Sequence, residues 1–130
     1  MQLDNALYAL VQIVHNFGAV AAVGLPLAAL RFRAAARDAY RRTLVAWIVQ
    51  LASGFGFGLV SYFVVEELPQ IGGLAFVALC VKILCAALAI AAAALLSWRP
   101  GVMSDATGLK ALAGLGTVAL FSAAILRWFS

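Results

Sequence analysis

The sequence is poor in charged residues. They make up 11% of the chain, with nine Lys and Arg against five Asp and Glu, whereas hydrophobic residues make up 66%. The mean hydropathy is +1.07. A water-soluble domain of this length does not have such a composition. The scarcity of charge therefore excludes a soluble globular protein and indicates a fold surrounded by lipid.

Histidine, cysteine and methionine are also scarce. His15 is the one histidine, and Met1 and Met103 lie outside the apolar segments. One chain therefore cannot supply two strong axial ligands to a buried haem, a Ser-His-Asp triad or a metal-ligand cluster of useful spacing. Cys80 and Cys85 are about 140° apart around a helix axis, so we expect them to diverge as packing residues. These absences indicate a protein that is not an independent enzyme.

Four apolar segments fill the chain almost from end to end. They cover residues of about 5–30, 43–65, 73–98 and 109–126. Each reaches the roughly 20 residues that a helix needs to cross about 30 Å of hydrocarbon. None has the alternating polarity of a membrane strand, and backbone in lipid must satisfy its own hydrogen bonds. We therefore expect an all-α membrane protein, one domain over 1–130, with four transmembrane helices in an up-down bundle.

The charges of the connections predict the orientation. The first connection, 31–42, has five arginines and one aspartate, whereas the second has Glu66 and Glu67 and no basic residue. Cytoplasmic connections carry the excess of Lys and Arg. The 31–42 loop is therefore predicted to be cytoplasmic, with the N-terminus and the C-terminus outside, in the periplasm. Its arginines are expected to contact anionic lipids of the bilayer, and no nucleic acid.

Two further predictions concern the ends of the spans that are expected to face the cytoplasm. Asp38 lies three and four residues before Arg41 and Arg42, a spacing that favours a short helical extension in the loop. Trp47 and Trp98 fall near the cytoplasmic interface in this orientation. Aromatic residues collect in a belt at that level of a membrane, so we expect both tryptophans to belong to such a belt.

Polar side chains inside the spans are the strongest pointers to function, because each is unfavourable in lipid unless it is paired. Gln12, His15 and Asn16 lie at spacings of three and four and so share one face of the first helix. At 1.5 Å per residue, His15 and Lys82 both fall about 15 Å deep, near the bilayer centre. The other predicted members of this inward-facing polar layer are Gln50, Ser53 and Thr117. These side chains either form hydrogen bonds that hold the helices together or make a functional site. His15 and Lys82 are the two ionisable residues among them.

A Gly-x-x-x-Gly pattern formed by Gly54 and Gly58 lies in the second span. It favours close helix packing. The alternative is a close approach to a flat cofactor, haem or quinone, with His15 and Asn16 as neighbouring binding residues. A haem would need a second ligand from another chain, and His15 is the candidate metal ligand of this one.

Three segments share their pattern with a known membrane family, namely HNFGAVAAVGLPL, RFRAAARDAYRR and FVALCVKILCAALAIAAAALLSWRP. They resemble the His-containing opening helix, the basic cytoplasmic connection and the Lys-containing helix of the copper-resistance protein D (CopD-type) family. As a pattern, the resemblance covers most of the chain. It implies copper handling at the bacterial inner membrane, with His15 and Lys82 at the family's polar positions.

Two functions remain open at this point. The first is a non-catalytic membrane subunit or anchor of a larger, respiratory or electron-transfer complex, with a haem or quinone shared with a partner chain. The second is a CopD-like protein that handles or transports copper or another ion, alone or as a homo-oligomer. The small size, the lack of sizeable loops and the lack of a soluble domain favour the subunit.

Overall fold

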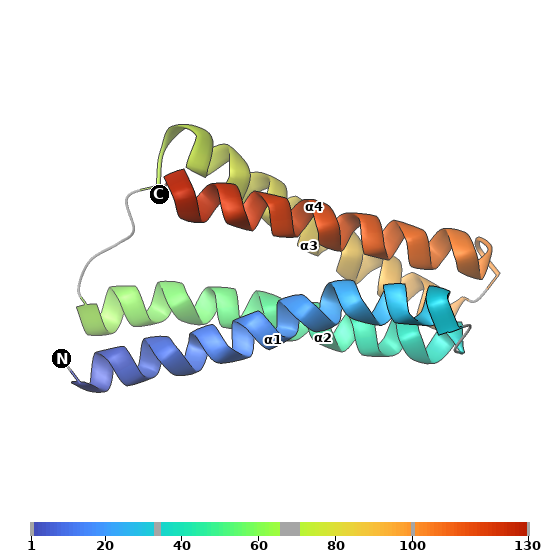
Figure 1. The fold of residues 1–130 in the computed structure, drawn as a ribbon, viewed down its shortest axis with the longest axis horizontal. Helices are drawn as coiled ribbons and strands as arrows, with labels where there is room; N and C mark the ends of the chain where they lie inside the picture. The colour runs from blue at the N-terminus through green and yellow to red at the C-terminus, as the bar shows by residue number, and fades with distance from the viewer. Residues whose placement is uncertain (1, 33–34, 66–70, 100, 130) are drawn as a thin grey trace.

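In a computed structural model, the described residues are 2–32, 35–65, 71–99 and 101–129, and almost all of them are helical (Figure 1). The helices are α1 (Gln2–Phe32), α2 (Ala36–Val60), α3 (Gly73–Trp98) and α4 (Asp105–Phe129), and a π-helical turn, η1 (Ser61–Val65), extends α2. All four α-helices are long and apolar enough to cross a membrane. This confirms the prediction of an all-α fold with four candidate membrane spans.

The first connection is shorter than predicted. Because α1 continues to Phe32 and α2 begins at Ala36, most of the 31–42 loop is helical. The helical extension predicted around Asp38 is confirmed and is longer than expected, since alanine and arginine are good helix formers beyond the apolar span. Four arginines are exposed on these helix ends: Arg31, Arg37, Arg41 and Arg42. Glu66 and Glu67, on which the orientation also rests, lie outside the described residues.

Two antiparallel hairpins form the bundle. α1 packs along α2 and α3 along α4, and the hairpins contact each other through α1 with α4 and α2 with α3. The start of α1 and the end of α4 lie at the same end of the molecule, as an up-down bundle requires (Figure 1). The hairpins lie close together at the other end and diverge towards the termini.

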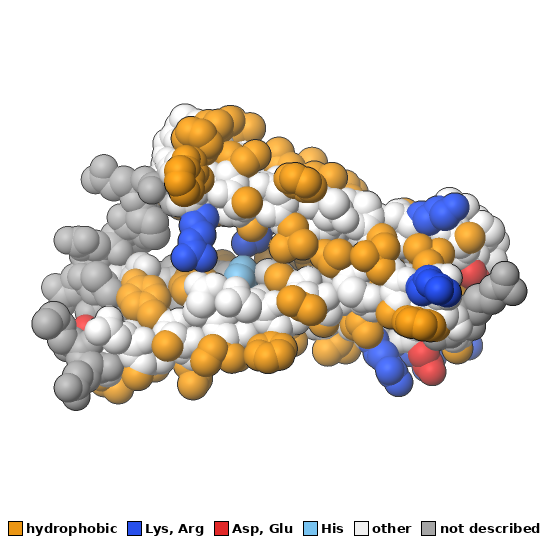
Figure 2. All heavy atoms as spheres, viewed as in Figure 1, with side chains coloured by type: hydrophobic (Ala, Val, Ile, Leu, Met, Phe, Trp, Pro, Cys, Tyr) orange, Lys and Arg blue, Asp and Glu red, His pale blue; other side chains and the backbone are white. Residues whose placement is uncertain are grey.

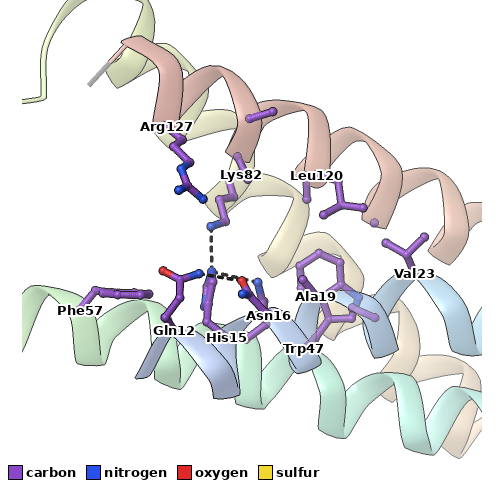
Figure 3. Close-up of a pocket in the computed structure, with 16 residues that line it drawn as sticks. Gln12, His15, Asn16, Ala19, Val23, Trp47, Phe57, Lys82, Leu120 and Arg127 are labelled. Atoms are coloured by element: carbon purple, nitrogen blue, oxygen red, sulfur yellow. Dashed lines mark hydrogen bonds between the residues drawn. The ribbon is translucent and has the colours of Figure 1, made fainter. Parts of the chain in front are cut away.

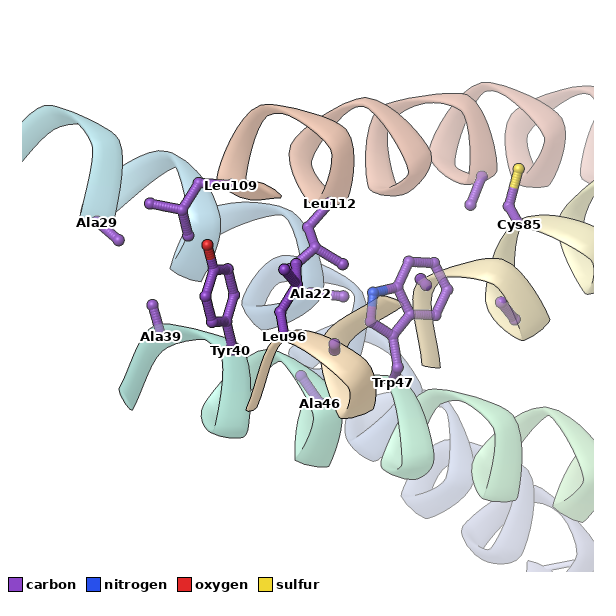
Figure 4. Packing of buried hydrophobic residues seen from close by; sticks show 14 residues of the cluster. Ala22, Ala29, Ala39, Tyr40, Ala46, Trp47, Cys85, Leu96, Leu109 and Leu112 are labelled. Carbon is purple, nitrogen blue, oxygen red and sulfur yellow. The ribbon is translucent and has the colours of Figure 1, made fainter. Parts of the chain in front are cut away.

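Small residues allow the close approach at the narrow end. Ala89 and Ala93 are fully buried, and Tyr40, Leu96 and Leu112 pack nearby in the same cluster (Figure 4). In a membrane, helices associate by close packing rather than by the hydrophobic effect, so small side chains at the interface are favourable. The narrow end is therefore the packed part of the bundle.

Trp47 does not lie where the belt prediction placed it. Its side chain is 2% exposed inside the bundle, whereas Trp98 is 84% exposed. The prediction is wrong for Trp47 because α2 begins well before the apolar span, which puts this residue about three turns inside the helix. Its indole N–H is buried and has no hydrogen-bond partner in the described part of the chain.

Gly108 marks the closest approach of α4 to Tyr40 and Leu96. A Cβ there would lie 2.6 Å from Tyr40 Oη and 2.9 Å from Leu96 Cδ1. We expect Gly108→Ala to lower the stability by about 1–3 kcal/mol, as overpacking does. Gly114→Ala in the same helix is the control, since its Cβ would meet nothing within 4 Å. Thermal unfolding in detergent compares the two variants, and equal midpoints would contradict this account.

Candidate functional site

The polar face of α1 lines a cavity inside the bundle. Gln12, His15 and Asn16 all contribute to its wall. Gln12 Nε2 donates to Asn16 Oδ1 at 2.7 Å, which pairs the two amides along the helix. His15 is half-buried and lies between them and α2. The predicted face of α1 is therefore the face that meets the cavity.

Two residues of α2, Ser53 and Gln50, contact the imidazole of His15. Its Nδ1 lies 2.7 Å from Ser53 Oγ, and Ser53 Oγ donates its proton to the carbonyl oxygen of Gln50 at 3.1 Å. A serine hydroxyl has one proton to donate. With the Ser53 hydroxyl proton on the Gln50 carbonyl, His15 Nδ1 is the donor towards Ser53, an arrangement that leaves a lone pair on Nε2.

That lone pair receives two donors from different helices. Gln50 Nε2 lies 3.0 Å from His15 Nε2, and Lys82 Nζ lies 3.2 Å from it (Figure 3). An amide nitrogen and an ammonium group donate but do not accept, so both contacts agree with an unprotonated Nε2. His15 thereby joins α1, α2 and α3 at the level of the predicted polar layer.

Close glycine contacts occur at Gly18 rather than at the predicted Gly-x-x-x-Gly pair. A Cβ at Gly18 would lie 2.7 Å from Gln50 Oε1. This oxygen is buried and has no hydrogen-bond partner among the described residues. A Cβ at Gly54 would make an ordinary contact of 3.7 Å with His15 Cε1, and one at Gly58 would meet nothing within 4 Å. Gly54 therefore lies beside the site, Gly58 lies away from it, and neither lines the cavity.

The cavity has a volume of about 660 Å³. Figure 2 shows it as a hollow between the hairpins, with the histidine inside and basic side chains beside it. Small-molecule sites in proteins commonly occupy about 300–1,000 Å³ and combine apolar walls with a few polar groups. The polar lining residues are Gln12, His15, Asn16, Gln50, Lys82 and Arg127, and the apolar ones include Trp47, Phe57 and a row of small residues from α1 and α4.

Arg127 is the functional candidate that the sequence did not single out. It follows the last apolar span and has the ordinary appearance of a helix end, yet its side chain points into the cavity towards Lys82 (Figure 3). Its position in the sequence could have indicated this, because it follows Gly116, Leu120 and Ala123 at helical spacing. These residues share one face of α4 and also line the cavity. Within the described residues, Arg127 has no ion pair or hydrogen bond.

The structure brings together most of the predicted polar layer, namely Gln12, His15, Asn16, Gln50, Ser53 and Lys82. Thr117 does not join them. Its side chain is exposed, and its hydroxyl donates to the carbonyl oxygen of Ala113 at 2.8 Å. The prediction is wrong for Thr117 because a threonine in a helix can satisfy its hydroxyl on its own preceding turn.

Metal ligands are sparse around His15. The described part of the chain has no group of three or more His, Cys, Asp or Glu able to hold a metal ion. His15 Nε2 faces Lys82 and Gln50, which are donors in these contacts. Cys80 is exposed and Cys85 is buried, in agreement with the prediction that they diverge. A metal ion or a haem iron at His15 Nε2 would need to displace Lys82, and the described residues offer it no group of further ligands.

Comparisons of the chain with known protein families, curated proteins and solved structures give no match. The helices and the cavity, which is called the cleft below, define a class: a multi-pass membrane protein with four candidate spanning helices and a cavity lined by apolar residues and a few polar ones. The chemistry of that cavity is the basis for assigning a function.

Proposed function

We propose that this protein is a non-catalytic, multi-pass subunit of an electron-transfer complex in the bacterial inner membrane, and that its cleft binds a quinone. The main support is the cavity itself, which combines apolar lining residues with a few polar side chains between membrane-spanning helices. A quinone has the matching chemistry, because its flat apolar ring carries oxygens that accept hydrogen bonds and its tail dissolves in lipid.

The donors around the cavity suit such a ligand. Lys82 and Arg127 approach from the α3–α4 hairpin, and the amide of Gln12 lies opposite them on α1 (Figure 3). Each of these groups donates hydrogen bonds to acceptor oxygens. Trp47 and Phe57 add aromatic surface to the wall, and aromatic rings favour offset or edge-to-face contacts with one another. The electron donor or acceptor would belong to a partner chain.

The proposed orientation places the wide end of the cleft towards the periplasm. The opposite end of the bundle carries the exposed side chains of Arg31, Arg37, Arg41 and Arg42. Basic residues near an anionic membrane surface contribute about 1 kcal/mol each. This charge supports a cytoplasmic position for the narrow end, in contact with anionic lipids.

Fluorescence of Trp47 tests quinone binding. Trp47 lines the cavity, whereas Trp98 and Trp128 are each 84% exposed. In a protein with Trp98→Phe and Trp128→Phe, embedded in lipid nanodiscs, we expect a short-chain benzoquinone to quench the remaining emission and to reach saturation. Ala19 lines the cavity, so Ala19→Phe should fill the space and abolish the saturable quenching.

Val20→Phe is the matched control for Ala19→Phe. Val20 follows Ala19 in the chain but is 69% exposed on the outer face of α1. A phenylalanine there should leave the quenching unchanged. Quenching that rises linearly with quinone, or that is equal in the two variants, would contradict a quinone site in this cleft.

Purification in a gentle detergent tests the assignment as a subunit. Cytochrome or iron–sulfur polypeptides that co-purify from the native membrane, identified by mass spectrometry, would support it. Recovery of the protein alone or as a homo-oligomer would favour copper or other ion handling instead. Copper uptake by cells should then depend on His15, the imidazole in the cavity wall.

A further inference from the structure

Among the residues that the structure describes, no carboxylate lines the cavity beside its basic side chains. Lys82 and Arg127 line the cavity, whereas the described carboxylates, Asp4, Asp38 and Asp105, do not. Along α1, Asp4 lies about 16 Å from His15. Within the described chain, the hydrogen bond of Lys82 goes to the neutral His15 Nε2, and Arg127 has none.

An uncompensated cation inside a membrane is unfavourable, and an opposite charge with good hydrogen-bonding geometry reduces that penalty. Lys82 lies about 14 Å from the start of α3, near the middle of a span, whereas Arg127 lies in the last turn of α4. The ammonium group of Lys82 has three N–H donors, and His15 uses one of them. The remaining donors are therefore available to a ligand that enters between the two side chains.

We infer that the cleft takes its ligand as an amphipathic oxyanion, with an acidic oxygen between Lys82 and Arg127. The apolar body of the ligand would lie on the wall formed by Ala19, Val23 and Leu120. This inference rests on the proposed function, since it specifies an ionised ring, such as a hydroxyquinone anion, as the form of quinone that is preferred. A fatty acid, with a carboxylate on an acyl chain, carries the same chemistry.

Two naphthoquinones of similar size test the charge directly. The hydroxy compound is ionised at neutral pH, and the methyl compound is neutral. The protein is the Trp98→Phe, Trp128→Phe variant, in which Trp47 is the remaining tryptophan, in nanodiscs of phosphatidylcholine. We expect the hydroxy compound to bind about tenfold more tightly than the methyl compound, as a charge-assisted hydrogen bond implies. Lys82→Met and Arg127→Gln should each lower its affinity about tenfold and that of the methyl compound by about threefold at most.

Lys110→Met is the matched control, because Lys110 is the other lysine of the chain and is exposed near the start of α4. It should change neither affinity. Size-exclusion profiles and circular dichroism confirm that each variant is folded. Arg127→Gln, at an exposed helix end, provides the charge test if Lys82→Met fails to fold.

The outcomes separate this inference from the proposed function. Equal affinities for the two naphthoquinones would overturn the inference and leave the quinone site standing. Decanoate is the fatty-acid probe. If it binds more tightly than either quinone and loses affinity in Lys82→Met, the preference for an oxyanion is supported and the assignment of a quinone as the ligand is overturned. Failure of all three probes to bind with saturation would overturn both.

Discussion

Replacing Lys82 with methionine is expected to make the protein more stable while it weakens ligand binding. A lysine at the centre of a membrane helix opposes insertion by about 2.5–3.5 kcal/mol. Its contact with His15 offsets part of this, at about 0.6 kcal/mol for a typical membrane hydrogen bond. Because Lys82 is partly open to the cleft, we expect a net gain of about 1–2 kcal/mol rather than the full amount.

Thermal unfolding in detergent measures this gain, and Lys110→Met again serves as the control. Lys110 is exposed at the narrow end, so its replacement should not raise the midpoint. A residue that destabilises the fold yet favours a ligand is expected at a functional site. A lower midpoint for Lys82→Met would instead show that Lys82 serves mainly to hold the helices together.

The second large effect is expected at His15. His15→Ala removes the contacts to Ser53 Oγ, Gln50 Nε2 and Lys82 Nζ. At about 0.6 kcal/mol for each contact in a membrane protein, the expected loss of stability is about 2 kcal/mol. His15→Gln can place an acceptor oxygen near the position of Nε2, so it should recover part of this loss. The midpoint of thermal unfolding in detergent is again the measurement.

Asn16→Ala provides the neighbouring comparison. Asn16 is exposed, and its hydrogen bond in the described chain is the one from Gln12. Its replacement should change the stability by no more than about 0.5 kcal/mol, as is usual for exposed positions. Equal losses for Asn16→Ala and His15→Ala would contradict the role of His15 as the junction of three helices.

Much of the candidate site was predictable because it depends on local geometry. Gln12, His15 and Asn16 share a helical face whatever surrounds it, and the constant rise per residue places Lys82 at the depth of His15. Arg127 was not predictable in this way. A basic residue after an apolar span is an ordinary helix end, and it becomes part of the cavity because the two hairpins diverge at that end of the bundle.

The sequence by itself determined the class of the protein and its four helices, since spanning lipid requires only sufficient length and apolar character along the chain. The tertiary structure alone decided which faces meet: Trp47 inside, Gly18 against Gln50, and Lys82 beside His15. In a soluble helix an apolar stripe marks the buried face. Here the lipid-facing residues are as apolar as most core-facing ones, so close packing of small residues and contacts between polar side chains decide which faces meet.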